Sequence, residues 1–291
     1  MNKLAILAFA LLLFFSTMLW YLANGSLNDY LKSQVLLQSE YYSSQPATLL
    51  SADFSNNTGI TTFTNFSLAN IDGLTQPQLF NVDNISVQLA ELATSQFDAP
   101  SVAKKTSTLV HVKELRFGNL HAWSEVVKSN EKDKSNIEIL FEKVRTTLAK
   151  DYPALYPQIS AELYAKMYPE RSEKLALENL DTQQKVQEVE TNQAIIASKE
   201  AKQKKRLLGK ALTRVTISSV IIDELTLTII KDNKILTKNV KDIQLGSFGD
   251  ENGLDSNQLG GELLKQILYK LISIEKSTVI KRQINAPHIE S

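Results

Sequence analysis

The N-terminus of this chain carries a run of 20 residues that contains no charged side chain. It covers residues 4–23 and reads LAILAFALLLFFSTMLWYLA, although the whole chain of 291 residues holds 32 basic and 32 acidic residues. At about 1.5 Å per residue, a helix of this length spans roughly 30 Å, the thickness of the hydrocarbon core of a bilayer. We therefore predict a transmembrane anchor over residues 1–25, with candidate membrane-contacting residues Leu4, Leu12, Phe14, Phe15, Trp20 and Tyr21.

A cleaved signal peptide is the alternative interpretation of this run. Signal peptides have a shorter apolar region of about 7–15 residues, followed by a cleavage site of small residues. Residues 23–25 form only a poor site of that type, and Trp20 and Tyr21 suit the headgroup boundary of a retained anchor. Because Lys3 precedes the run, the positive-inside rule places the N-terminus in the cytoplasm. In a Gram-negative cell, the bulk of this single-pass inner-membrane protein would then lie in the periplasm.

The composition argues against several classes of function. The formal net charge is zero and the pI is about 6.9, whereas nucleic-acid-binding domains usually carry a basic excess. The chain contains no cysteine, which excludes disulfides, thiolate metal sites and a cysteine nucleophile. We expect no nucleic-acid partner.

The search for catalytic residues finds no recognisable constellation. His111, His121 and His288 are dispersed along the chain, and neither a phosphate-binding glycine loop nor a nucleophile elbow occurs. The pair Gly260-Gly261 lies near the start of a predicted helix, where backbone amides could hold an anion or where the lack of side chains could allow close packing. We favour close packing, and we predict a protein that is not an enzyme and has no cofactor or metal ion.

Alternation of apolar and polar residues predicts strands over about 51–118 and 214–246. Ile85, Val87 and Leu89 place apolar side chains on one face. From Val110 to Phe117 the alternation changes parity, which predicts a bulge or a bend. Asp232-Asn233 predicts a hairpin turn. Together these patterns predict an antiparallel sheet.

Helical spacing predicts the remaining elements: a short amphipathic helix at 27–42, a long helical insertion at about 135–212, a C-terminal amphipathic helix at about 256–274 and a loose tail at 281–291. Because strands lie on both sides of the insertion, we predict one discontinuous α+β domain over residues 26–280, with the sheet covered by the amphipathic helices.

Two sets of residues are candidates for lipid contact. The first set could form an apolar groove on one face of the sheet and consists of Ile85, Val87, Leu89, Leu225, Leu227 and Ile229. The second set is a basic cluster that could contact anionic headgroups and includes Lys202, Lys204, Lys205 and Arg206. Alternatively, the basic cluster is a solvated helix end and the apolar face is covered by the protein's own helices, and we favour both of these interpretations.

Several segments, taken in order, resemble the AsmA-like proteins of Gram-negative envelopes. The matching segments are 27–32 (LNDYLK), 58–60, 66–74, 76–89 (QPQLFNVDNISVQL), 136–140, 220–227 and 240–245, followed by the glycine turn before the C-terminal helix. The similarity covers about two-thirds of the chain and leaves residues 152–212 without a counterpart. Residues 71–74 also depart from the family's pattern, which usually places a proline before its Gly-aromatic pair.

The resemblance implies a periplasm-facing protein anchored in the inner membrane. Its sheet would be curved, with an apolar concave face, in a scaffold associated with outer-membrane biogenesis and with phospholipid transport between membranes. No catalytic residues follow from the family. The alternative function is an envelope interaction scaffold in which the helical insertion binds a partner protein. A hydrolase with an unrecognised site is the third and least favoured hypothesis.

Overall fold

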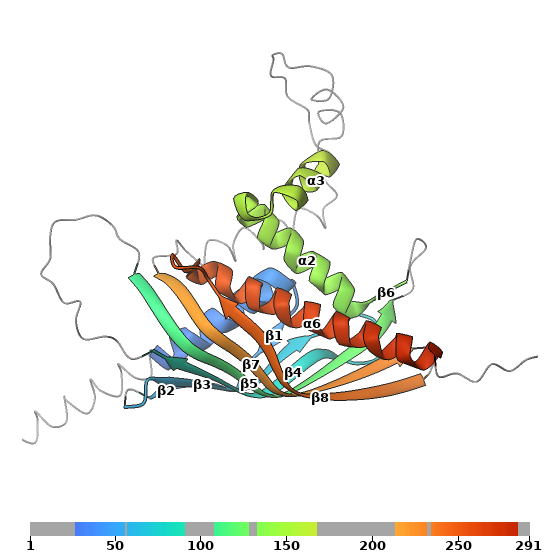
Figure 1. Ribbon diagram of the computed structural model, residues 1–291, viewed down its shortest axis with the longest axis horizontal. Helices are drawn as coiled ribbons and strands as arrows, with labels where there is room; N and C mark the ends of the chain where they lie inside the picture. Colours follow the sequence, from blue (N-terminus) through green and yellow to red (C-terminus); the bar gives the residue numbers. More distant parts are fainter. Residues whose placement is uncertain are drawn as a thin grey trace, which may run out of the picture.

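A curved sheet with helices on its concave face makes up this protein (Figure 1). The computed structural model describes residues 27–55, 57–90, 108–127, 133–167, 213–231 and 234–284. The strands are β1 (Ala47–Thr48), β2 (Ser51–Ser55), β3 (Ile60–Ala69), β4 (Gln78–Leu89), β5 (Thr108–Val127), β6 (Lys134–Ser135), β7 (Thr213–Lys231), β8 (Lys234–Phe248) and β9 (Leu254–Asp255). The helices are a helix over residues 27–43, α2 (Asn136–Asp151), the short 3-10 helix η1 (Pro153–Leu155), α3 (Pro157–Met167) and α6 (Ser256–Ile284).

The sheet is mixed rather than antiparallel. Its order is β1-β3-β4-β5-β7-β8, with β2 beside β3, β6 beside β5 and β9 beside β7. The central pair β5 and β7 is parallel, with Leu120 opposite Leu225, so the prediction of an antiparallel sheet is wrong at this pair. The physical reason is the connection between the two strands. It carries α2 across the concave face, so that β7 runs in the same direction as β5, as parallel pairing requires.

Irregular pairing in β4 and β5 explains the change of parity in the sequence. Gln88 pairs with Glu114 and Leu89 pairs with Val112, so the pairing skips Lys113. This extra residue keeps Val112 and Leu115 on the buried face, although their spacing is odd. The predicted bulge is therefore confirmed.

The predicted hairpin between β7 and β8 is also present. The two strands pair in antiparallel fashion up to Lys231 opposite Lys234. The turn residues 232–233 lie outside the described residues.

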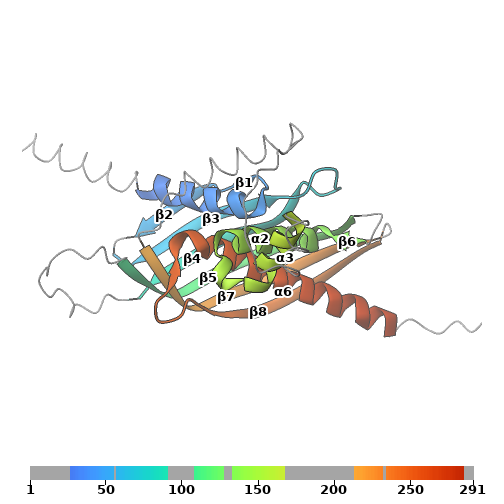
Figure 2. The ribbon, with the colours of Figure 1, turned by 90° about the horizontal axis from the view of Figure 1, so that it is seen from above.

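The helices begin close to the residues that the sequence predicts, but the C-terminal helix ends later than predicted. The amphipathic helix at 27–43 matches its prediction, and α2 begins with a capping box in which Ser135 and Glu138 exchange hydrogen bonds. The C-terminal helix α6 begins at Ser256 but continues to Ile284, so the first four residues of the predicted loose tail are helical. Seen from above, the 27–43 helix lies on the side of β1 and β2, whereas α6 lies on the side of β7 and β8 (Figure 2).

Several predicted features fall outside the described residues. They are the anchor at 4–23, the part of the helical insertion at 168–212 that holds Lys202, Lys204, Lys205 and Arg206, and the end of the tail at 285–291. In the part of the chain that the structure does describe, no helix has both the length and the apolar character needed to cross a membrane.

Candidate functional site: an apolar cavity between the sheet and two helices

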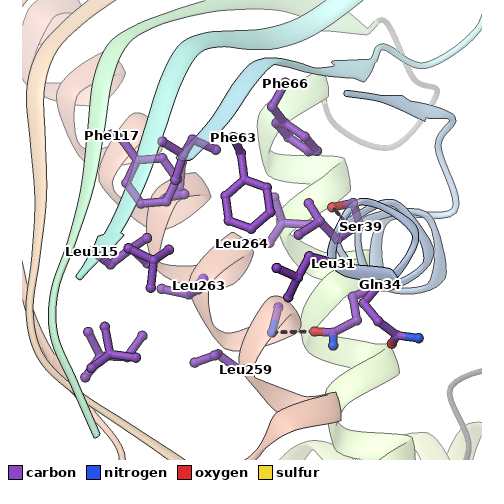
Figure 3. Close-up of a pocket in the computed structure, with 18 of the residues that line it drawn as sticks. Leu31, Gln34, Ser39, Phe63, Phe66, Leu115, Phe117, Leu259, Leu263 and Leu264 are labelled. Atoms are coloured by element: carbon purple, nitrogen blue, oxygen red, sulfur yellow. Dashed lines mark hydrogen bonds between the residues drawn. The ribbon is translucent and has the colours of Figure 1, made fainter. Parts of the chain in front are cut away.

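An apolar cavity of about 330 Å³ lies between the concave face of the sheet, the 27–43 helix and the first half of α6 (Figure 3). The sheet contributes side chains from β3, β4, β5 and β7: Phe63, Phe66, Phe80, Ile85, Val87, Val112, Leu115, Phe117 and Ile217. The helices contribute Leu31, Gln34, Val35, Gln38, Ser39, Ser256, Leu259, Gly260, Leu263, Leu264 and Ile267. The cavity thus spans three parts of the chain that are distant in sequence.

The lining is uncharged, and its polar groups lie on one side. Among the described residues that form it, none is Asp, Glu, Lys, Arg or His. The polar members come from the two helices, whereas the sheet side is entirely apolar. Ser39 donates to the backbone oxygen of Val35 at 2.7 Å, so this hydroxyl is bonded within its own helix. Such a lining suits a hydrocarbon ligand and offers no ionic contact.

Gln38 joins the two helical walls of the cavity. Its Nε2 donates to the backbone oxygen of Ser256 at 3.0 Å, and its Oε1 accepts from the backbone N–H of Gly260 at 3.0 Å. Beside it, the Tyr42 hydroxyl donates to the backbone oxygen of Asn257 at 2.8 Å. Tyr42 is almost fully buried, and this burial raises the pKa of its hydroxyl, which therefore stays a neutral donor.

The glycine pair at the start of α6 makes this close contact possible. A Cβ atom at Gly260 would lie 2.4 Å from the Gln38 Oε1 atom, and one at Gly261 would lie 2.8 Å from the Tyr42 ring. The amide of Gly260 is used by Gln38 rather than held open for an anion. The favoured interpretation of the pair, close packing of the first turn, is therefore confirmed.

The N-terminal end of the 27–43 helix is tied to the edge of the sheet. The backbone N–H of Phe54 donates to Asn28 Oδ1 at 3.0 Å, and Lys32 Nζ donates to the backbone oxygen of Leu50 at 2.9 Å. In the sequence, only three residues separate this helix from the uncharged run at 4–23. One wall of the cavity is thus formed by the segment that directly follows the predicted anchor.

Two of the six residues predicted for an apolar groove line the cavity. These are Ile85 and Val87, and Leu89 packs at the margin of the core. Leu225, Leu227 and Ile229 lie elsewhere in the buried core and do not line it. The reason is the position of α6, which packs against β7 and buries a long apolar stripe: Leu264, Ile267, Leu268, Leu271 and Ile272.

Sequence reasoning missed the aromatic part of the cavity. Phe63 and Phe66 both point inward, despite their odd spacing, because Asn65 between them has a φ of 51° and shifts the alternation. The Phe66 and Phe80 rings lie 6.0 Å apart between their centroids. A run of β residues in which phenylalanine recurs after three positions is the signal that could have shown this change in the alternation.

A second, polar cavity of about 380 Å³ lies between η1, the end of β8 and the opposite side of α6. There Glu262 accepts hydrogen bonds from the Tyr156 hydroxyl, from Lys265 and from Gln258. Burial, together with the bond to Glu262, raises the pKa of Tyr156. Because Tyr156, Gln258 and Lys265 all bond to this carboxylate, the cluster fastens the segment that follows α2 to α6.

Two of the three isolated histidines lie on β5 beside threonine side chains of β7. His111 bonds to Thr216 at 2.8 Å, and His121 bonds to Thr228 at 3.2 Å, while His288 lies outside the described residues. Burial lowers the pKa of His121. Among all the residues whose placement is described, no group of three or more His, Asp or Glu residues could hold a metal ion.

No protein-family model matches the sequence, and no curated protein matches it at a significant level.

Proposed function

We propose that this protein is a non-enzymatic, inner-membrane-anchored envelope protein of the AsmA-like type that handles lipid in the periplasm. One observation carries the proposal: a preformed, uncharged cavity has as one wall the helix that follows the uncharged N-terminal run. The AsmA-like pattern in the sequence supports the same assignment.

The energetics of such a cavity favour an acyl chain as its occupant. Transferring a methylene group from water to an apolar site contributes about 0.8 kcal/mol. A cavity that is already formed between a sheet and two hydrogen-bonded helices needs little ordering when the ligand enters. The protein would thus hold a chain outside the bilayer for assembly or transfer.

The dimensions of the sheet limit what one molecule can do. The longest strand, β5, has 20 residues, which corresponds to roughly 65 Å at about 3.3 Å per residue. The cavity occupies only part of this length, because α6 covers the buried face of β7 beyond Ile217. Transport across the whole periplasm would therefore need a partner protein or further copies of the chain.

A photoreactive amino acid placed in the cavity tests the proposal in the intact membrane. The full chain would carry it at Leu263, which lines the cavity, or at Ile235, which is 70% exposed on β8 and serves as the matched control. After irradiation, mass spectrometry should find a lipid adduct at Leu263 and little at Ile235. Equal labelling at both positions, or no adduct at Leu263, would refute the proposal.

A scaffold function is the second candidate, and the position of α3 favours it. This helix packs against α2 and η1 and projects away from the sheet (Figure 1). Ala161 and Glu162 on it are exposed. The same photoreactive amino acid at Gln158, an exposed residue near the start of α3, should label a partner protein if the insertion is a docking element. Loss of that adduct when a flexible linker replaces residues 168–212 would assign the contact to the insertion.

A further inference from the structure

We infer that the cavity holds one acyl chain at a time and selects its ligand by chain length rather than by headgroup charge. The inference rests on the proposed lipid-handling function and adds the class of ligand: a single-chain amphiphile, or one chain of a phospholipid whose other chain stays outside.

The size of the cavity supports one chain. Its volume of about 330 Å³ lies at the lower end of the range of about 300–1,000 Å³ that is typical of ligand cavities. The space is also divided from the rest of the concave face, because Leu225 and Leu227 of β7 are fully buried and leave no continuing groove there. A second chain would therefore find no apolar groove on the β7 side of the cavity.

The chemistry of the lining supports indifference to headgroup charge. The groups on the polar side are neutral amides and hydroxyls: Gln34, Gln38, Ser39 and Ser256. Two cations on the helical walls, Lys32 and Lys265, are directed away from the lining. Lys32 donates to the backbone oxygen of Leu50 outside the lining, and Lys265 is paired with Glu262 on the opposite side of α6. A phosphate or an ammonium group at the cavity would therefore meet no charged side chain among the described lining residues.

The aromatic side chains support a limit on chain length. Phe66 and Phe80 lie against each other, and their exposed fractions are only 7% and 2%. These two rings therefore form a fixed boundary of the lining. In a close-packed interior such rings cannot move aside without cost. Each methylene that fits should raise affinity about fourfold, and methylenes beyond the boundary should add nothing.

A displacement assay on the full chain, kept soluble in an amphipathic polymer, tests the inference. A fluorescent fatty acid would be displaced by lysophosphatidylcholine and lysophosphatidylglycerol, each over a series of chain lengths. We expect affinity to rise about fourfold per methylene and then reach a plateau, with less than threefold difference between the two headgroups at equal length. The variant Val87→Phe, which reduces the cavity, should move the plateau to shorter chains, whereas Ile235→Phe on the exposed edge should not.

The outcomes separate the inference from the function on which it rests. A preference of tenfold or more for one headgroup, or an affinity that keeps rising with chain length, would overturn the inference and leave lipid handling intact. A plateau that Val87→Phe does not move would overturn the assignment to this cavity. If no lysolipid displaces the probe and no lipid adduct forms at Leu263, the proposed function fails as well.

Discussion

Replacing Gln38 and Gly260 by cysteine should join the 27–43 helix to α6 through a disulfide. A Cβ atom at position 260 would lie 3.0 Å from the Cβ atom of Gln38. Disulfides hold their Cβ atoms about 3.5–4.5 Å apart, so a small outward shift of the 27–43 helix is sufficient. Because the chain has no other cysteine, no competing bond can form within it.

The expected gain in stability follows from the length of the closed loop. Positions 38 and 260 are 260 − 38 = 222 residues apart, for which the loop-entropy relation gives about 5 kcal/mol. The substitution also removes the two hydrogen bonds of Gln38, at a cost of about 1 kcal/mol each. We therefore expect the oxidised variant to be more stable than the natural protein by about 3 kcal/mol.

Urea unfolding of the double variant measures this gain directly, with the reduced form of the same protein as the matched control. The reduced form should be less stable than the natural chain by about 2 kcal/mol, and the oxidised form more stable. If the cysteines fail to join under mild oxidation, the close contact between Gln38 and Gly260 is not present in solution. An oxidised form no more stable than the reduced form would refute the argument from loop length.

Three further changes test the packing of α6. Burial raises the pKa of Glu275 above its usual value of 4.5, so its contribution to stability is present below that value and is lost as the pH rises through the raised pKa. We therefore expect Glu275→Gln to stabilise the protein more at pH 7 than at pH 4, when the free energy of unfolding is compared with that of the natural protein at each pH. The control Glu251→Gln, on an exposed turn, should show no such difference. Gly261→Ala should lower the free energy of unfolding by about 1–2 kcal/mol, because the added Cβ atom crowds the Tyr42 ring and this outweighs the better helix propensity of alanine. The exposed Ser273→Ala serves as the control. An unchanged stability of Gly261→Ala would show that the contact can relax. Leu268→Ala, at a fully buried position, should cost about 2–5 kcal/mol in urea unfolding, and Tyr269→Ala at its exposed neighbour much less.

Local patterns predicted the elements of this fold well. Apolar residues alternate in β4 and β7 and follow helical spacing in α6, because one side of each element faces the core. This pattern depends only on residues that are close together in the sequence. Even the bulge at Lys113 was visible, because an extra residue changes the parity of the apolar positions. The 27–43 helix followed from the same reasoning.

The arrangement of those elements could not be predicted in the same way. A buried strand has the same alternation whether its neighbour is parallel or antiparallel. The residues of β5 and β7 alone therefore could not predict that the two strands pair in parallel. Likewise, Ile85 and Leu225 present equivalent apolar faces, and only the position of α6 decides that the first lines a cavity and the second lies in packed core. The cavity depends on which part of the sheet the helices cover, and the alternation of apolar residues in a strand carries no information about that.

The parallel pairing of β5 with β7 also has a consequence for how the chain reaches its native state. Thr108 pairs with Thr213, so 213 − 108 = 105 residues must emerge before the centre of the sheet can close. Until then, one edge of β5 has no strand to pair with along most of its 20 residues. Pairing across such a separation is slow, and exposed strand edges favour aggregation. The N-terminal strands should therefore stay only partly assembled until the residues from Thr213 onward are available, and folding should depend on chaperones more than the size of the chain suggests.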